Sequence, residues 1–213
     1  MKQICVFLSN KGQGSNLQAL IDACKSGVLK ANICAVVSDV ADAYGLERAK
    51  KNKIPTLVFP LKNRLDAQAR KNWGLELGKK VKKKFKPDLI ILAGWMLILP
   101  KAFLELFPNK VINLHPGLIP DKGQKFIKIK KNIKIPSFAG KMANDAIKEA
   151  FKLGVPASGS TVHMVSPIVD EGRVLKRTIE YIRKHDTVES YYQRLKKKEH
   201  KILIEAIKLF FNQ

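Results

Sequence analysis

The stretch QICVFLS (residues 3–9), which runs directly into NKGQGSN (10–16), decides the fold class. Its first part is a nearly unbroken apolar run, which predicts a buried β-strand over 3–9. The glycines of the second part let the backbone turn tightly, and a helix is expected over about 16–26. A strand that passes through a glycine-rich turn into a helix indicates an α/β protein.

The same turn is a candidate anion site. Ser15 or Asn16 is suited to cap the helix, and the free N–H groups at a helix N-terminus favour an anion. The spacing matches neither a Walker A motif nor a complete GxGxxG motif. A phosphate cradle and an ordinary strand-to-helix turn therefore remain equally open.

Strand-like and helical patterns alternate along the chain, which predicts a parallel sheet covered by helices on both faces. The basic stretch 121–138 is expected to be a loop or insertion. No repeat or linker divides the sequence, so residues 1–213 are expected to form a single domain. The other predicted strands are 32–38, 56–59, 87–94, 110–115, 158–165 and 173–181, and the other predicted helices are 43–52, 66–85, 102–107, 140–153 and 187–211.

The composition is that of a folded globular protein. The 213 residues are 46% hydrophobic and 27% charged, which allows a continuous core. The longest apolar stretch, 89–100, is interrupted by Gly94 and is shorter than the roughly 20 residues of a membrane-spanning helix. The apolar residues 4–8 are too few for a signal peptide, so a cytoplasmic location without a membrane partner is expected.

The net charge of +22 is the unusual feature of the composition. A strongly basic surface attracts nucleic acid and also phosphorylated or carboxylate-rich small molecules. The interleaved arginine and aromatic residues of nucleic-acid readers are scarce here, so a solvated lysine-rich surface is expected and nucleic acid is not. The lysines concerned include Lys79, Lys80, Lys82, Lys83, Lys84, Lys128, Lys130, Lys131, Lys196, Lys197 and Lys198.

The cysteines indicate neither a disulfide framework nor a metal site. Cys5, Cys24 and Cys34 lie inside apolar segments and form no CxxC pair. An odd number also argues against a set of disulfides. We expect buried thiols that pack as small hydrophobic groups.

The predicted strand 110–115 carries the first candidate catalytic residues. Asn113 and His115 are two positions apart, so their side chains share one face of the strand. They lie at its C-terminal end, where parallel α/β sheets bind ligands. An amide donor beside an imidazole suits a reaction that develops an oxyanion and needs a proton, although a histidine at a strand end is often structural.

A second group lies at GSTVH (159–163) and DEG (170–172). Thr161 and His163 share a strand face, and Asp170 lies in the following loop. A carboxylate near His115 would favour its protonated form and raise its pKa, which makes an effective acid near neutral pH. The alternative for DEG is a simple turn before the next strand.

Seven motifs follow one another along the chain: FLS with GSNLQAL (7–9 and 14–20), ADAYGLERA (41–49), LAGWM (92–96), NLHP (113–116), GSTVH (159–163), DEG (170–172) and EH (199–200). Taken in this order, they resemble the glycinamide ribonucleotide formyltransferase family nearly from end to end. The resemblance implies a Rossmann-like formyltransferase fold with a mostly parallel seven-stranded sheet flanked by helices. The ordered set is far more specific than any one motif in it.

This resemblance implies an enzyme that moves the formyl group of 10-formyltetrahydrofolate to the amine of glycinamide ribonucleotide in de novo purine biosynthesis. Asn113 would bind the developing oxyanion and His115 would be the general acid. Asp170 would keep His115 charged and help to move protons through water, and His163, with Thr161, would support them. The transfer would be direct and would need no metal.

The resemblance also assigns the ligand contacts. The substrate residues would be Gly14, Ser15 and Asn16 at the phosphate and Glu199 at the ribose or amine. An arginine would also reach the ligands, with Arg70 aligning best and Arg64 as its competitor. The folate pocket would be lined by Arg70, Met96, Leu97, Ile98, Leu99, Asn113, Ser166 and Val169.

The chain departs from the family pattern in four places. The turn at 10–16 and the stretch 121–138 are longer than usual, Leu97 replaces a common arginine, and Ser158 replaces a common histidine.

Three alternative functions remain open. The first is a formyltetrahydrofolate hydrolase, which usually has an extra N-terminal domain. The second is a methionyl-tRNA formyltransferase, which needs a C-terminal RNA-binding domain. A basic nucleic-acid-binding protein is the third. We expect small-molecule partners and a monomer or homodimer.

Overall fold

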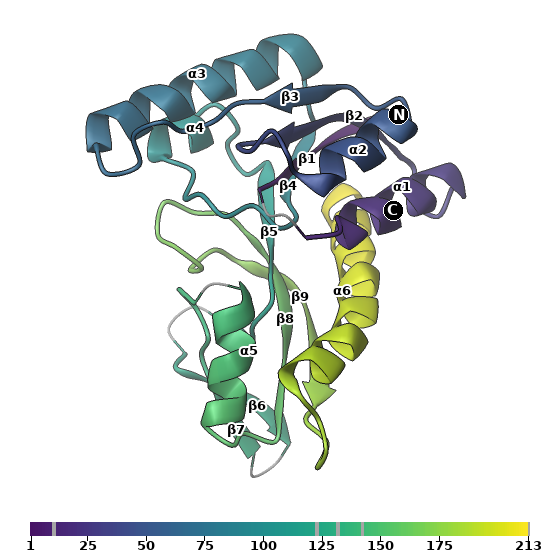
Figure 1. Ribbon diagram of the computed structural model, residues 1–213, viewed down its shortest axis with the longest axis vertical. Coiled ribbons are helices and arrows are strands. Elements are labelled where there is room, and N and C mark those ends of the chain that lie inside the picture. The colour runs from purple at the N-terminus through teal and green to yellow at the C-terminus, as the bar shows by residue number, and fades with distance from the viewer. Residues whose placement is uncertain (10–11, 122–123, 131–132, 142, 213) are drawn as a thin grey trace. The chain divides into compact units, whose positions relative to one another are not determined.

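The structure is a computed structural model, and it describes residues 1–9, 12–121, 124–130, 133–141 and 143–212 (Figure 1). Parts of the predicted turn, of the stretch 121–138 and of the helix 140–153 therefore lie outside the described residues. The elements are β1 (Lys2–Leu8), α1 (Ser15–Lys25), β2 (Ala31–Ser38), α2 (Tyr44–Lys51), β3 (Thr56–Val58), α3 (Ala67–Phe85), β4 (Leu89–Leu92), α4 (Lys101–Leu104), β5 (Val111–His115), β6 (Phe126–Lys130), β7 (Ile133–Pro136), α5 (Ala143–Lys152), β8 (Ala157–Met164), β9 (Val174–Tyr181) and α6 (Val188–Phe211).

Seven strands form one sheet in the order β3-β2-β1-β4-β5-β8-β9. β1 pairs in parallel with β2 and β4, and β2 pairs in parallel with β3, whereas β8 and β9 are antiparallel. The predicted α/β class with a mostly parallel seven-stranded sheet is confirmed. The strand order changes direction between β1 and β4, and right-handed crossovers then place α1 and α2 on one face and α3 and α4 on the other. Open α/β sheets bind ligands at such a switch point.

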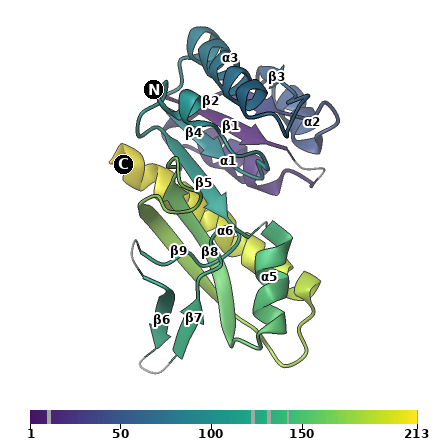
Figure 2. The same ribbon diagram turned by 90° about the vertical axis from the view of Figure 1, so that its left-hand side faces the viewer.

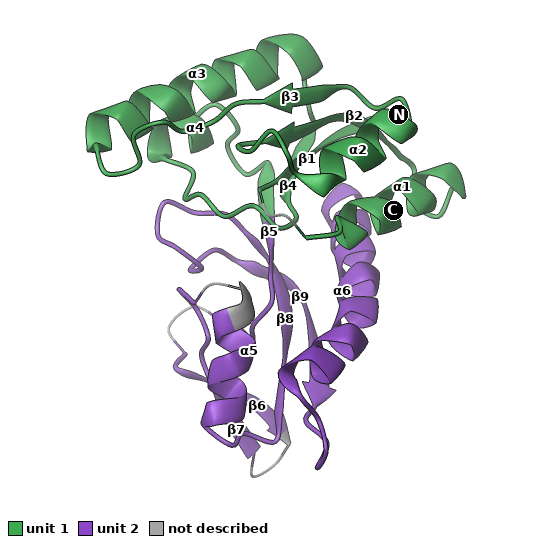
Figure 3. Cartoon of the chain, viewed as in Figure 1, with its two compact units in different colours: residues 1–112 green, residues 113–213 purple. Residues whose placement is uncertain are grey.

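The chain divides into two compact units, residues 1–112 and 113–213, with the boundary inside β5 (Figure 3). The single domain over 1–213 stays a prediction. In the first unit, β1 and β4 are buried almost completely, because helices cover both faces of a parallel sheet. Aromatic rings extend this core: the ring centroids of Phe7 and Trp95 are 5.1 Å apart, and those of Trp73 and Trp95 are 6.2 Å apart.

The second unit packs α5 and α6 against β8 and β9 (Figure 2). Every residue of β8 is buried, although the strand carries Ser158, Ser160, Thr161 and His163. Buried polar side chains generally need hydrogen-bond partners, and Ser160, Thr161 and His163 each have one.

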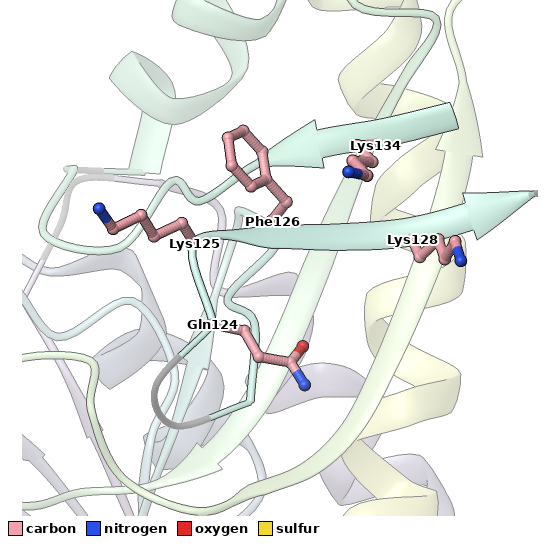
Figure 4. A pocket seen from close by; sticks show the side chains of 5 residues that line it. All are labelled: Gln124, Lys125, Phe126, Lys128 and Lys134. Carbon is pink, nitrogen blue, oxygen red and sulfur yellow. The ribbon is translucent and has the colours of Figure 1, made fainter. Parts of the chain in front are cut away.

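The stretch 121–138, predicted as a loop, contains an antiparallel hairpin of β6 and β7. Its isoleucines pack on a core cluster that includes Leu118, Phe138 and Ala146, and they alternate with outward-facing lysines. Lys128 and Lys134 are cross-strand partners and line a shallow cavity of about 320 Å³ together with Gln124, Lys125 and Phe126 (Figure 4). The loop interpretation is wrong because the many lysines obscured a strand pattern of period two.

Most predicted elements are confirmed with ends within one or two residues. β4 is Leu89–Leu92, shorter than the predicted 87–94, and Gly94 has a φ of 88°, which is outside the strand region. α4 is Lys101–Leu104, shorter than the predicted 102–107, because its last residues form a turn. These differences at the ends of β4 and α4 do not change the topology.

Candidate active site

The turn after β1 is shaped by Gly14, whose φ of 63° lies in the left-handed region. Gly14 is the N-cap residue of α1, and its carbonyl accepts a hydrogen bond from the Gln18 N–H at 3.0 Å. The prediction that Ser15 or Asn16 caps the helix is wrong, because both residues already belong to α1. The first N–H groups of a helix have no partner within it, so the end of α1 can receive an anion.

The predicted folate segment follows β4 and is tied to the end of β1. The Met96 N–H donates a hydrogen bond to Ser9 Oγ at 2.9 Å. Met96 and Ile98 are exposed, Leu97 is half-buried, and Leu99 is buried. The segment therefore offers apolar side chains at the surface of the first unit beside the residue from which the glycine turn starts.

Of the two arginines proposed to reach the ligands, one is already engaged. Arg64 forms an ion pair with the buried carboxylate of Asp39, at 3.6 Å between nitrogen and oxygen. Arg70 lies half-buried in the first turn of α3. The engagement of Arg64 favours Arg70 as the ligand contact.

Three segments of the second unit bring the predicted catalytic residues together. Asn113 and His115 lie on β5, His163 lies on β8, and Asp170 lies in the loop before β9. Asp170 Oδ2 is 3.5 Å from His115 Nδ1, and Asp170 Oδ1 is 3.3 Å from His163 Nε2. Asn113 Nδ2 is 3.3 Å from the same His163 nitrogen. The side chains of His115, His163 and Asp170 are all less than a tenth exposed, so little water screens their charges.

Two backbone carbonyls fix one proton on each imidazole. Phe138 O lies 3.1 Å from His115 Nε2, and Met164 O lies 2.9 Å from His163 Nδ1. A carbonyl oxygen only accepts hydrogen bonds, so each of these nitrogens carries a hydrogen. The second nitrogen of each ring faces Asp170. The cluster can therefore hold a further proton and pass it between the two histidines through one carboxylate.

Burial lowers the pKa of His115 below its ordinary value, and it outweighs the raising effect of the Asp170 carboxylate. The net direction is opposite to the one expected from the sequence, although the contribution of Asp170 has the expected sign. The pKa of Asp170 is also lowered: burial raises it, but the hydrogen bond with His163, the charge of His115 and the Gly140 N–H together exceed that effect. Asp170 is therefore ionised at neutral pH.

Main-chain features hold the cluster in place. Asp170 has a φ of 57°, which is unusual for a residue other than glycine and is a form of strain that gathers at functional sites. The Gly140 N–H donates to Asp170 Oδ2 at 2.8 Å. A Cβ atom at Gly117 would lie 2.7 Å from His115 Nε2, so only glycine leaves room for the imidazole there.

Thr161 supports the site through hydrogen bonds to the main chain. Its hydroxyl donates to Gly117 O at 2.9 Å and accepts from the Ile119 N–H at 3.0 Å. Thr161 thereby fixes the segment that follows His115. This agrees with a supporting role, and it explains why a buried strand keeps a hydroxyl at this position.

The remaining predicted ligand contacts are Glu199, Val169 and Ser166, and they differ in how exposed they are. Glu199, on α6, is buried and accepts a hydrogen bond from Ser160 Oγ at 2.6 Å, and burial raises the pKa of its carboxyl. A contact with substrate would require this carboxyl to become accessible, so its role stays a prediction. Val169 is exposed beside Asp170, and Ser166 Oγ donates to Ile168 O within the same loop.

The sequence did not indicate that Phe138 and Gly140 contact the candidate catalytic residues. Both contacts are made by main-chain atoms, the Phe138 carbonyl and the Gly140 N–H. Side-chain chemistry could not have signalled them, and the only hint was a glycine after the basic stretch. These two atoms bind the imidazole and the carboxylate of the candidate catalytic pair.

Among the described residues, no group of three or more histidine, cysteine, aspartate and glutamate side chains is arranged to hold a metal ion. Within the same ranges, no helix is both long enough and apolar enough to cross a membrane.

Comparison with known proteins matches residues 2–207 to the formyl transferase family. The chain belongs to this family. This formyl transferase is 40% identical over 216 residues to a phosphoribosylglycinamide formyltransferase of Dictyostelium discoideum, with 97% of the chain and 96% of the relative covered. It is 36% identical to the enzyme of the same name from Haemophilus influenzae, with 99% and 87% covered.

Solved structures agree with the fold of this formyl transferase. Glycinamide ribonucleotide transformylase 1 of Symbiobacterium toebii has a TM-score of 0.82 at 34% identity and covers 99% of this chain and 87% of its own. The transformylase 1 of Geobacillus kaustophilus has a TM-score of 0.81 at 30% identity, with 99% and 98% covered. Both likenesses extend over nearly the whole chain.

Proposed function

We propose that this formyl transferase moves the formyl group of 10-formyltetrahydrofolate to the amine of glycinamide ribonucleotide, a step of de novo purine biosynthesis. The observation that carries the proposal is the meeting of Asn113, His115 and Asp170 around His163: both imidazoles lie beside the Asp170 carboxylate, and the half-buried Asn113 amide lies beside His163. The relatives that share the chain nearly end to end bear the name of this activity.

In the proposed reaction the amine nitrogen attacks the formyl carbon, a C–N bond forms, and the carbonyl oxygen becomes an oxyanion. The Asn113 amide and the His115 Nε2–H stabilise that oxyanion. The Nε2–H already donates to an oxygen, Phe138 O, so the formyl oxygen would take the place of this acceptor. Losing one such donor typically costs about 10²–10³ in rate.

The second step breaks the bond between the formyl carbon and folate N10. The amine loses one proton and N10 gains one, so the overall reaction needs no external acid. His115, Asp170 and His163 are suited to carry that proton, because the free nitrogen of each ring faces the same carboxylate.

The first unit supplies binding in this proposal. The N–H groups around Gly14, Ser15 and Asn16 receive the substrate phosphate, and Arg70 with the segment 96–99 contacts the folate. In the second unit, taken by itself, Ser166 and Val169 are the proposed folate contacts, and Glu199 is the proposed contact to the ribose or amine once its carboxyl becomes accessible. We place the enzyme in the cytoplasm as a monomer or homodimer.

The test is a formyl-transfer assay in which glycinamide ribonucleotide, water and tRNA compete as acceptors. The proposal expects product from glycinamide ribonucleotide and only background from the other two. Release of formate without acceptor would support a hydrolase, and formylation of charged tRNA would support a tRNA enzyme. Either result as the main activity would overturn the proposal.

A further inference from the structure

Arg48, on α2, makes three contacts: one with the glycine turn, one with α1 and one with an aromatic ring of its own helix. Its Nε–H donates to Gln13 O at 2.6 Å, and its Nη1 donates to Gln18 Oε1 at 2.9 Å. The guanidinium carbon also lies 5.2 Å from the centre of the Tyr44 ring. One side chain thus joins α2, the turn before Gly14 and the first turn of α1.

The partner on α1 is held in a fixed orientation. Gln18 Nε2 donates to Asp22 Oδ1 at 2.9 Å, so the amide presents its oxygen to Arg48. A planar guanidinium can donate to two acceptors in fixed directions at once, whereas a lysine ammonium on a flexible stem cannot keep the same geometry. The arrangement is therefore specific for arginine.

The hydrogen bond from Arg48 to Gln13 O fixes the direction of the Gly14 N–H group. In a planar trans peptide, the C=O of Gln13 and the N–H of Gly14 point in opposite directions. Because Arg48 holds the carbonyl, the Gly14 N–H points away from Arg48. The turn also lies against α2: a Cβ atom on Gly14 would be 3.1 Å from Gly45 Cα and 3.4 Å from Arg48 Cδ.

We propose that Arg48 is a positioning residue for the phosphate of the substrate. It holds the peptide between residues 13 and 14 so that the Gly14 N–H and the first N–H groups of α1 converge on one anion. The inference rests on the proposed function, because it assigns the turn to the substrate phosphate. Arg48 acts through the main chain and makes no contact with the reacting atoms.

The experiment compares Arg48→Ala, Arg48→Lys and Lys51→Gln in the full chain. Lys51 is an exposed cation on the same helix, so its loss controls for charge alone. For both Arg48 variants we expect the KM for glycinamide ribonucleotide to rise about tenfold, with kcat within about twofold. The KM for the folate should not change, and Lys51→Gln should match the wild type.

A second measurement uses inorganic phosphate as the probe and needs no turnover. Its dissociation constant, followed by NMR of the Gly14 amide, should increase in both Arg48 variants by the same factor as the KM. Full rescue by Arg48→Lys, an equal effect of Lys51→Gln, or a fall in kcat with an unchanged KM would overturn the proposal. A wild-type turn that binds no phosphate would also overturn it, whereas phosphate binding without transfer to glycinamide ribonucleotide would defeat only the proposed function.

Discussion

The glycine turn after β1 and the cluster around Asp170 are built by different means. The turn consists of main-chain groups, with Gly14 as N-cap and Arg48 as a brace from the next helix. The cluster consists of side chains from β5, β8 and a loop, and its members are almost completely buried. The turn would bind through main-chain N–H groups, whose direction depends on Gly14 and Arg48, whereas the cluster would act through the imidazole and carboxylate groups of its own side chains.

This difference decides where substitutions act. Single substitutions at the turn should each lower the affinity for the substrate phosphate only moderately, because each one displaces only a few main-chain N–H groups. A buried cluster that shares one carboxylate between two imidazoles should fail as a whole when one member is lost. The predictions below test that contrast, beginning with the largest effect.

Replacing His115 or Asp170 by alanine should lower kcat about 10³-fold or more, because the acid and its charged partner act as one group. Asp170→Asn, which keeps the size of the side chain, should be nearly as damaging. Steady-state formyl transfer measures the effect, and thermal unfolding shows that the fold survives. His185 is an exposed histidine, so His185→Ala is the matched control and should retain wild-type turnover. Near-normal activity of either cluster variant would remove the catalytic assignment.

Gly117→Ala should lower kcat about 10²-fold without removing any catalytic group. The added Cβ would lie 2.7 Å from His115 Nε2 and 3.1 Å from Phe138 Cβ, so the imidazole must move. The KM for the phosphorylated substrate should stay within about twofold, because the turn is untouched. An unchanged kcat would show that the ring has more freedom than its buried surroundings suggest.

The fold could be predicted from sequence because its signals are local and repeated. The apolar run of β1, the glycine turn and the alternation of strands with helices need no knowledge of distant residues. The hairpin of β6 and β7 was missed because its isoleucines alternate with lysines, and a high lysine content suggested a solvated loop. The topology survived this error, since the hairpin forms a separate two-stranded sheet.

The candidate site could be predicted only where side chains carry the information. Asn113, His115 and Asp170 were predicted from their chemistry and order, and they do meet. The carbonyl of Phe138 and the N–H of Gly140 could not be predicted, because every residue has such groups. The direction of the His115 pKa was also missed, since it depends on how completely the fold excludes water from the ring.

That pKa gives a third test of the cluster. The His115 pKa should lie below its ordinary value of about 6.5, so turnover that needs the protonated ring should fall up to tenfold per pH unit above it. Asp170→Asn removes a negative charge that favours protonation, so the His115 pKa should drop further. NMR titration of the imidazole measures both values, even in an inactive variant. A wild-type pKa above 6.5 would mean that the carboxylate outweighs burial.

The smallest effect is expected at the turn, where Gly14→Ala and Gly27→Ala form a matched pair. Both glycines have positive φ, at 63° and 74°, so alanine should cost each about 1–2 kcal/mol of stability. Around Gly27 no described atom lies within 4 Å of an added Cβ, whereas the Cβ on Gly14 would press against Gly45 and Arg48. Only Gly14→Ala should therefore raise the KM for glycinamide ribonucleotide, by about five- to tenfold, with kcat nearly unchanged. If the two variants raise the KM equally, backbone strain alone explains the effect; if Gly14→Ala lowers kcat instead, the turn and the cluster are not the separate binding and chemical regions that the contrast requires.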